Sequence, residues 1–444
     1  MRMRIMSNKK IIAIAAVVVL VAAGAGAFLL LNKSEKRTEE INIVTGLEGV
    51  GSGFYYKPGS IDASKLFVTD QSGAVAVDGN GEVKYRAEGW NRLVIGSPGV
   101  VSIQHIQLKT IVEIYLKDQS RVDGPTKSYK LVAWREGEAL RDGEVGYVVT
   151  GGAASAIEGY KLDIGLTWQP QLAKLDAGSY DVLVRTNELF PHQTCCLTIA
   201  NQSFLQDNPG VSERVVWAIV QATEWLNAAK EKGKSNPSDP DYLRLLEIGR
   251  GIAGPNFTTE DLIAAIEDVE YAWGDIGYSA SDPLSKIKSD IALQTEDLSK
   301  TGDLRNTLGD LGFSSYAQYA DALVDDSVLK RVLANGIDSK PPYDSWSEVR
   351  FVLIAGDIHQ LPVHIANALL PGQSQSLYSQ VGITFKRIDV SIGAAVISGL
   401  KANEADFGVT GQPSLIVDNV NNKLSAPGAA RVAAPVAAEA QAKV

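Results

Sequence analysis

The chain has 444 residues, of which 45% are hydrophobic and 21% are charged. This composition is typical of a globular protein, and the length is sufficient for two or more domains. The formal net charge of −10 argues against a nucleic-acid-binding or anionic-membrane-binding surface. It does not exclude a small anionic ligand, because backbone N–H groups can bind an anion within an acidic protein.

An uncharged, mostly apolar run extends over residues 11–31. It is long enough for a transmembrane helix, since a hydrocarbon core of about 30 Å requires roughly 20 residues. The basic residues that precede it are Arg2, Arg4, Lys9 and Lys10. By the positive-inside rule they place the N-terminus in the cytoplasm, so we expect the residues after 40 to lie outside the cell. A cleaved signal peptide is the alternative, because small residues suited to cleavage occur at 23–27. The apolar run continues past them, which favours a retained anchor, with a charged stalk up to residue 40.

Short apolar strands alternate with helical patterns from residue 41 onwards, which is typical of an α/β fold. The predicted strands lie at 41–48, 53–56, 92–95, 129–134, 181–185 and 195–199, with a hairpin at 74–85. Residues 203–335 are mainly helical, with helix starts predicted near Pro209, Thr258 and Ser315. A second α/β stretch follows at 349–422. The Ala- and Pro-rich tail at 423–444 is expected to be disordered.

One internal repeat relates residues 140–151 to residues 400–411. Each copy predicts a helix end, a tight turn and a buried strand, and each finishes in a Thr-Gly pair. The carboxyl ends of strands are where α/β sheets bind ligands. The repeat therefore predicts two similar lobes that present Thr150-Gly151 and Thr410-Gly411 to a shared cleft. Chance similarity of two short units is the alternative.

A glycine-rich turn, GSPGVVS at 96–102, precedes a predicted helix. Such a turn can direct backbone N–H groups and the helix dipole at a negative group. It matches neither the P-loop nor the dinucleotide-binding fingerprint. A plain tight turn with Ser102 as the helix cap is equally compatible with the pattern.

The cysteines and histidines form no recognisable metal or catalytic pattern. Cys195 and Cys196 are adjacent, which disfavours a disulfide and fits no zinc motif. His359 and His364 are five residues apart, whereas two zinc ligands on one helix face are four apart. His192 lies near the cysteines, but a Cys–His dyad needs a third, orienting group. We therefore expect no catalytic residue, no metal and no cofactor.

Taken together, these segments resemble the substrate-binding proteins of ABC importers in the nitrate/sulfonate/taurine group, which have the type II periplasmic-binding fold. The resemblance covers most of residues 41–422. Its most specific stretches are GSGFYYKPGS (51–60), GSPGVVSIQH (96–105), NELFPHQTCCLTIANQSFLQDNPGV (187–211), GDIHQLPVHIANAL (356–369) and LKANEADFGVTGQPS (400–414).

In the usual order of that family, the equivalent of residues 349–422 precedes the equivalent of residues 41–345. The resemblance therefore implies a circular permutation, which compact domains tolerate because their termini often lie close together. Lobe one would comprise 41–50, 187–345 and 346–422, including the helical region, and lobe two would comprise 51–186. A gene-assembly artefact and an incomplete second copy of the domain are the alternatives.

The resemblance also implies a set of ligand-binding residues. Lobe one would supply Asp357, His359, Gln360, Thr410, Gly411 and Gln412. Lobe two would supply Ser52, Gly53, Ser97, Gly99, Val101 and Ser102. Thr150 and Gly151 stand where many relatives have a Trp-Glu-Pro segment, and that departure removes an aromatic wall.

The sequence thus predicts a two-lobed type II periplasmic-binding-protein fold with a helical extension, preceded by one transmembrane helix. The expected function is that of a non-enzymatic, extracytoplasmic solute-binding protein, anchored in the cell membrane and monomeric. It would capture a small anionic or polar ligand and deliver it to an ABC permease with its ATPase subunits, without binding nucleic acid. The alternatives are an enzyme like those of thiamine-pyrimidine synthesis, which share this fold, and a surface ligand-sensing domain.

Overall fold

The computed structural model describes residues 41–47, 51–71, 73, 75–78, 82–151, 159–190, 194–274 and 281–422. The predicted anchor at 11–31, His192 and the predicted tail at 423–444 lie outside these ranges. Among the residues so described, no helix combines the length and the apolar character that a membrane crossing requires.

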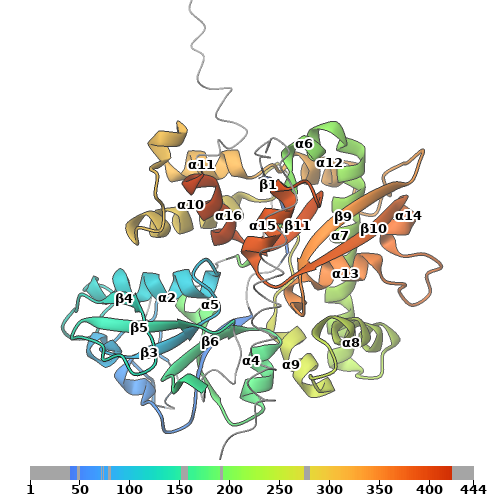
Figure 1. Ribbon diagram of the computed structural model, residues 1–444. Coiled ribbons are helices and arrows are strands. Elements are labelled where there is room, and N and C mark those ends of the chain that lie inside the picture. The colour runs from blue at the N-terminus through green and yellow to red at the C-terminus, as the bar shows by residue number, and fades with distance from the viewer. Residues whose placement is uncertain are drawn as a thin grey trace, which may run out of the picture. The chain divides into compact units, whose positions relative to one another are not determined.

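The first sheet has five strands in the order β1-β8-β11-β9-β10. Their bounds are β1 (Ile41–Gly46), β8 (Cys196–Asn201), β9 (Ser347–Ile354), β10 (Ile383–Val390) and β11 (Phe407–Gly411). Strands β9, β10 and β11 are parallel, whereas β8 runs antiparallel to both β1 and β11. Two segments from opposite ends of the described chain, β1 and β9, therefore belong to one sheet (Figure 1).

The second sheet has six strands in the order β4-β5-β3-β6-β2-β7. Their bounds are β2 (Ser52–Tyr56), β3 (Val94–Ser97), β4 (Lys130–Ala133), β5 (Glu144–Val149), β6 (Ile164–Trp168) and β7 (Asp181–Arg185). Strands β3, β4, β5 and β6 are parallel, and β2 is antiparallel to β6 and β7. The predicted α/β class is confirmed, with two mixed sheets.

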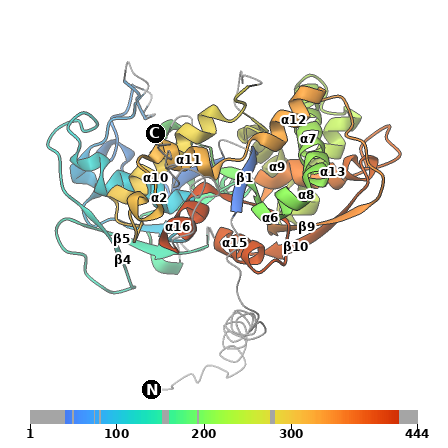
Figure 2. The same cartoon turned by 90° about the horizontal axis from the view of Figure 1, so that it is seen from above.

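Helices follow most strands, and most of the long ones lie between 209 and 335. Those associated with the second sheet are α2 (Ile103–Glu113), α4 (Gln171–Asp176) and α5 (Thr186–Leu189). The helical region contains α6 (Gln202–Asp207), α7 (Pro209–Ser235), α8 (Pro240–Ala253), α9 (Thr259–Asp268), α10 (Ser285–Lys300), α11 (Tyr316–Leu323) and α12 (Ser327–Asn335). The last α/β stretch adds α13 (Leu361–Asn367), α14 (Leu377–Gln380), α15 (Gly393–Lys401) and α16 (Gln412–Asn421). Figure 2 shows α10, α11 and α16 grouped together, and α10 contacts both of the others.

Local capping chemistry explains where the helices of the helical region begin. Pro209 is the first residue of α7, where its missing N–H costs nothing. Thr258 and Asp261 form a reciprocal capping box at the start of α9. The side chain of Ser315 accepts the N–H of Gln318 at the start of α11. All three predicted helix starts are confirmed.

The helical pattern after Ser315 is interrupted at Val324. The chain leaves the helix there because Val324 forms a parallel bridge with Ile43 of β1, and the N–H of Asp325 donates to the carbonyl oxygen of Ile43. Pairing with the sheet edge therefore divides one predicted helical stretch into α11 and α12.

The two sheets pack against different main hydrophobic clusters, which defines two lobes, and the first cluster also takes in Ile103, Ile106 and Ala173 from the helices of the second sheet. The cluster of the first sheet includes Ile43, Phe351 and Val409 together with residues of α7. The cluster of the second sheet includes Trp90 and Leu166.

The two repeat copies end in β5 and β11, as predicted, but a helix precedes only the second of them. Helix α15 ends shortly before β11. The connection before β5 consists of residues 134–143, which join the parallel strands β4 and β5 through turns. A connection this short cannot both reverse direction and hold a helix.

Candidate functional site

A cavity of about 310 Å³ lies between the two lobes. The lobe of the second sheet contributes the turn at 98–102 and the first residues of α2. The lobe of the first sheet contributes the loop after β9, the start of α15 and the segment that joins β11 to α16. The site therefore lies at the carboxyl ends of β3, β9 and β11, where α/β sheets bind ligands.

Three helices, α2, α15 and α16, begin at this cavity. The first N–H groups of a helix have no partner within the helix, and the helix dipole places partial positive charge there. Ser102 caps α2 by accepting the N–H of His105 at 3.2 Å, whereas α15 and α16 have no side-chain cap. Among the described residues that line the cavity, none is Lys or Arg, and Asp357 is the acidic one. The positive potential of the site therefore comes from the backbone.

Apolar side chains form much of the remaining wall. Trp168, at the end of β6, lines the cavity together with Val149 and Ile392. Val149 and Ile392 are 54% and 53% exposed, so they lie at the rim of the cavity. The site can therefore cover an apolar part of a ligand as well as a polar part.

The structure places half of the sequence-predicted site residues at the cavity. These are Gly99, Val101, Ser102, Asp357, His359, Thr410 and Gly411. They come from three separate strand–loop–helix units, which the fold brings to one place.

Four further predicted residues lie behind the cavity wall and hold other residues in position. Ser52 accepts a hydrogen bond of 2.8 Å from Gln104, which itself lines the cavity. Ser97 shares a hydrogen bond of 2.9 Å with His105. Gln360 donates to Asp357 at 3.1 Å, and Gln412 donates to the backbone oxygen of Thr194 at 2.8 Å.

The other three predicted residues are not among those that line the cavity. Gly53 lies within β2, where an added Cβ would be 2.9 Å from Leu172. Thr150 donates to the carbonyl oxygen of Ser97 at 3.2 Å. Gly151 continues the turn after β5 with a φ of 61°. The first Thr-Gly pair of the repeat thus supports β3, while the second faces the cavity.

Thr410 differs from the other predicted site residues at the cavity because its hydroxyl is buried without a hydrogen-bond partner among the described residues. Its side chain is 1% exposed, and its hydroxyl has no hydrogen-bond partner in the described part of the chain. A Cβ added at Gly393 would lie 2.4 Å from this hydroxyl and 3.0 Å from that of Ser414. Glycine at the first position of α15 therefore leaves room beside the Thr410 hydroxyl.

His105 and Ser97 form a buried pair directly behind the glycine-rich turn. The His105 ring packs edge-on against Tyr147, with centroids 4.7 Å apart. Burial lowers the pKa of His105 to about 4, and nearby Lys109 acts in the same direction, while Asp303 opposes it. His105 is therefore neutral at physiological pH and braces the turn without contributing charge.

Several side-chain contacts connect the lobes, and two of them involve α2 or the turn before it. The hydroxyl of Ser414, in α16, donates to the carbonyl oxygen of Val101 at 3.1 Å. Lys109, in α2, pairs with Asp303 at 2.8 Å.

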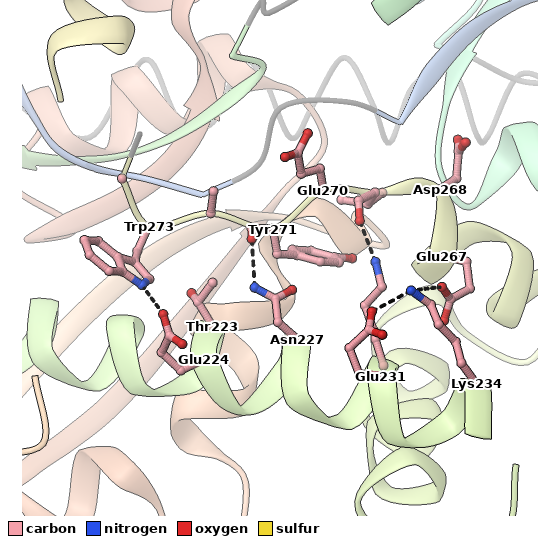
Figure 3. A pocket seen from close by; sticks show the side chains of 14 residues that line it. Thr223, Glu224, Asn227, Glu231, Lys234, Glu267, Asp268, Glu270, Tyr271 and Trp273 are labelled. Atoms are coloured by element: carbon pink, nitrogen blue, oxygen red, sulfur yellow. Dashed lines mark hydrogen bonds and ion pairs between the residues drawn. The ribbon is translucent and has the colours of Figure 1, made fainter. Parts of the chain in front are cut away.

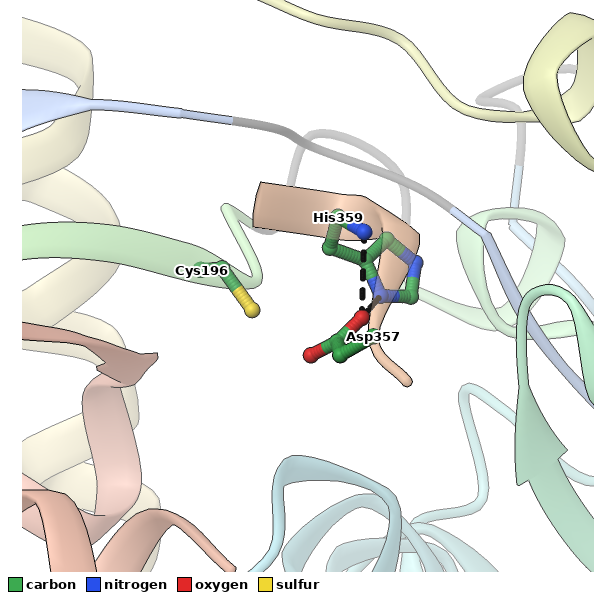
Figure 4. Close-up of side chains that lie close together, drawn as sticks. All are labelled: Cys196, Asp357 and His359. Carbon is green, nitrogen blue, oxygen red and sulfur yellow. Dashed lines mark hydrogen bonds and ion pairs between the residues drawn. The ribbon is translucent and has the colours of Figure 1, made fainter. Parts of the chain in front are cut away.

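Sequence reasoning missed several side chains at the site, among them Cys196, Trp168 and Ser414. Trp168 supplies an aromatic wall from β6. Cys196 lies beside Asp357 and His359, and the ligand atoms of the three residues are all within 4.8 Å of one another. Figure 4 shows the Cys196 sulfur directed toward the Asp357 carboxylate and the His359 ring. No local pattern marks these residues, because the strands that hold them are distant in sequence.

A second cavity of about 610 Å³ lies between α7 and residues 267–274. Several of its polar side chains contact one another or the backbone (Figure 3). Trp273 donates to Glu224 at 2.6 Å, and Lys230 donates to the carbonyl oxygen of Val269 at 2.8 Å. These contacts hold residues 267–274 against α7. The side chains involved therefore have a structural role that requires no ligand.

The chain matches no protein-family model, and it matches no curated protein. Among solved structures, it is similar to the ligand-binding component of an ABC-type import system from Staphylococcus aureus, determined with zinc bound. The identity is 13%, and the alignment covers 67% of this chain and 76% of that chain, with a TM-score of 0.35. A superposition of this quality does not establish a shared fold. The class that the two sheets and their different main hydrophobic clusters define is a two-lobed α/β protein with a cavity between its lobes.

Proposed function

We propose that this chain is a solute-binding protein that holds a small anionic or polar ligand between its two lobes and delivers it to an ABC permease. One observation carries the proposal. The N-termini of α2, α15 and α16, contributed by both lobes, meet at a cavity whose described lining contains no Lys or Arg. Backbone N–H groups arranged in this way bind anions and hydrogen-bond acceptors.

The size and lining of the cavity narrow the ligand class. Its volume of about 310 Å³ suits a small molecule. The helix ends would receive the anionic group, while Trp168 and Val149 would cover an apolar part. A small sulfonate, nitrate or taurine-like compound fits this division, and the unpartnered hydroxyl of Thr410 could donate to an anionic oxygen.

The proposal also covers the membrane anchoring of the protein and the order of its segments along the chain. The anchor at 11–31 would hold a monomeric binding domain on the outer side of the cell membrane, next to the permease and its ATPase subunits. The circular permutation is part of the proposal as well. It is supported by the shared sheet of β1 and β9, since a permuted chain requires these strands to lie in one lobe.

A thermal-shift screen tests the proposal, because a ligand that binds only the folded state raises the melting temperature. The panel would contain methanesulfonate, taurine, nitrate and bicarbonate, with pyrimidines and amino acids for the alternative functions. We expect one of the small anions to give a shift that saturates, and calorimetry should then show one site per chain.

A matched pair of glycine variants ties any binding to the cavity. An added Cβ meets no atom within 4 Å at Gly99, which lines the cavity, or at Gly251, which lies in α8. Gly99→Phe should therefore abolish the shift, whereas Gly251→Phe should retain it. A panel in which no anion binds, or in which both variants bind equally well, would refute the proposal.

A further inference from the structure

Three side chains with different ligand atoms meet in the wall of the cavity. They are the thiol of Cys196 at the start of β8, the carboxylate of Asp357 after β9, and the imidazole of His359. They are 5%, 4% and 1% exposed, respectively. Their ligand atoms all lie within 4.8 Å of one another.

The orientation of the imidazole turns one nitrogen toward the other two groups. Nε2 of His359 faces Gly51, where an added Cβ would lie 2.5 Å from it. Nδ1 lies 2.7 Å from an oxygen of Asp357 and is the nitrogen on the side of Cys196 (Figure 4). Nδ1 is therefore the nitrogen that we assign to the cluster with the thiol and the carboxylate.

We propose that Cys196, Asp357 and His359 bind a divalent transition-metal ion of the Zn²⁺ type. Thiolate, imidazole and carboxylate are the three ligand classes that proteins use for Zn²⁺, and three protein ligands leave a fourth position for water or another molecule. Because all three residues line the cavity, that fourth position would open into it.

Charge balance supports a divalent ion. A thiolate and a carboxylate contribute two negative charges, the imidazole is neutral as a ligand, and a divalent cation compensates both charges at a buried position. The described lining of this cavity contains no Lys or Arg that could supply this charge.

The geometry requires only small adjustments. Tetrahedral Zn²⁺ with bonds of about 2.0–2.3 Å separates its ligand atoms by about 3.5 Å. The Nδ1–carboxylate distance of 2.7 Å would widen, while the other separations, which are at most 4.8 Å, would shorten or stay. Asp357 is positioned by a hydrogen bond from the His359 backbone at 3.0 Å and one from Gln360 at 3.1 Å, which are outer-sphere contacts suited to a metal ligand.

Metal binding replaces the hydrogen bond between His359 and Asp357 and releases protons. The sulfur–metal bond forms as the thiol proton leaves to solvent, and Nδ1 becomes available as its proton moves to Nε2 or to solvent. Neither the oxidation state of the metal nor that of the sulfur changes. This inference concerns the same cavity as the proposed function, but it does not depend on that function, because it stands on these three side chains alone.

Two neighbouring residues serve as matched controls. The sulfur of Cys195 lies 3.8 Å from that of Cys196, yet Cys195 does not belong to the three-residue cluster. His364 lies one helical turn beyond His359 and is likewise outside the cluster. A chemical response specific to the cluster must therefore distinguish Cys196 from Cys195, and His359 from His364.

The experiment measures Zn²⁺ binding to untagged, chelator-stripped full-length protein by equilibrium dialysis, in buffer without any candidate anion. Co²⁺ replaces Zn²⁺ in parallel, because a thiolate ligand adds a sulfur-to-cobalt charge-transfer absorption. We expect one metal ion per chain, the charge-transfer band in the wild type and in Cys195→Ser, and its loss in Cys196→Ser. Zn²⁺ affinity should fall about 100-fold or more in Cys196→Ser and Asp357→Asn, since the loss of an outer-sphere partner alone costs 10- to 100-fold.

The outcomes separate this inference from the proposed function. Zn²⁺ binding without anion binding would uphold the metal site and overturn the anion proposal. Anion binding without Zn²⁺ binding would uphold the anion proposal and overturn the metal site. Absence of stoichiometric binding, or equal affinity of Cys196→Ser and Cys195→Ser, would overturn the metal site. If Cys196→Ser does not fold, as judged by circular dichroism, His359→Gln compared with His364→Gln decides the question, with loss expected in the first and retention in the second.

Discussion

Replacing Thr410 by valine should make the protein more stable and a poorer binder at the same time. The hydroxyl of Thr410 is buried and has no hydrogen-bond partner among the described residues, and Thr410 is one of the residues that line the cavity. An unsatisfied buried polar group costs about 1–3 kcal/mol, so a valine of nearly the same shape should raise the free energy of unfolding by about 1 kcal/mol. A hydrogen bond to a charged ligand is worth about 1.5–3 kcal/mol. Its loss should raise Kd roughly 10- to 100-fold.

Thr198 provides the control for this prediction. Its hydroxyl is also buried and also lacks a partner among the described residues, with a side chain that is 0% exposed. Thr198 lies in β8 opposite Val409, and it is not among the residues that line the cavity. Thr198→Val should therefore increase stability by a similar amount without changing affinity.

Chemical denaturation and titration calorimetry, performed on the same preparations, measure the two effects. The calorimetry would use the small anion that gives the largest saturable shift in the thermal screen. The reasoning fails if Thr410→Val binds that anion as tightly as the wild type. It also fails if Thr198→Val loses as much affinity as Thr410→Val, because the effect would then have nothing to do with the cavity.

Two further predictions concern pH and the coupling of ligands. The pKa of His105 is lowered to about 4 by burial, so below about pH 6.5 the unfolded chain takes up a proton that the folded chain does not. The free energy of unfolding therefore decreases as the pH falls. In His105→Gln, the decrease between pH 7 and pH 5 should be smaller than in the wild type by about 2 kcal/mol. Urea titrations that give the variant and the wild type the same pH dependence would contradict this. In the second case, Zn²⁺ at the site of Cys196, Asp357 and His359 should tighten anion binding, because it neutralises the carboxylate that faces the cavity. By linkage the anion should then raise Zn²⁺ affinity by the same factor, and an anion Kd that calorimetry finds unchanged by Zn²⁺ would contradict the prediction.

The sequence was sufficient for features that depend on neighbouring residues. The caps at Thr258 and Ser315 were predictable because a helix start is determined by side chains within one turn of it. Gly99 was expected at the site because it lies in a glycine-rich turn before a helix, and Thr410 because it ends the second copy of the repeat; the family resemblance implied both. The division at Val324 was not predictable, because it depends on pairing with β1, which is remote in sequence.

The direction of each side chain at a strand end explains why only half of the predicted site residues reach the cavity. Thr150 and Thr410 occupy equivalent positions in the repeat, yet Thr150 donates to the backbone of Ser97, whereas the hydroxyl of Thr410 stays without a partner in the described part of the chain. The difference arises because β5 lies next to β3 in its sheet, where the Ser97 carbonyl is available as an acceptor. A sequence repeat therefore predicts where two strands end, but it cannot predict which neighbour completes the hydrogen bonding of each end.

The proposed metal site likewise depends on which strands are neighbours in the sheet, and here sheet pairing brings residues together that the sequence keeps apart. Spacing rules judge ligands that lie on one element, and by those rules the sequence did not pair His359 with His364. A ligand set assembled from β8 and the loop after β9 has no characteristic spacing, because β11 lies between the two strands and the sheet order determines their proximity. Once that order is known, Cys196 and Asp357 become neighbours, and together with His359 they offer three possible ligand atoms within 4.8 Å of one another. The argument for a metal site at this cavity therefore depends on the fold, because the positions of the two cysteines in the sequence do not indicate one.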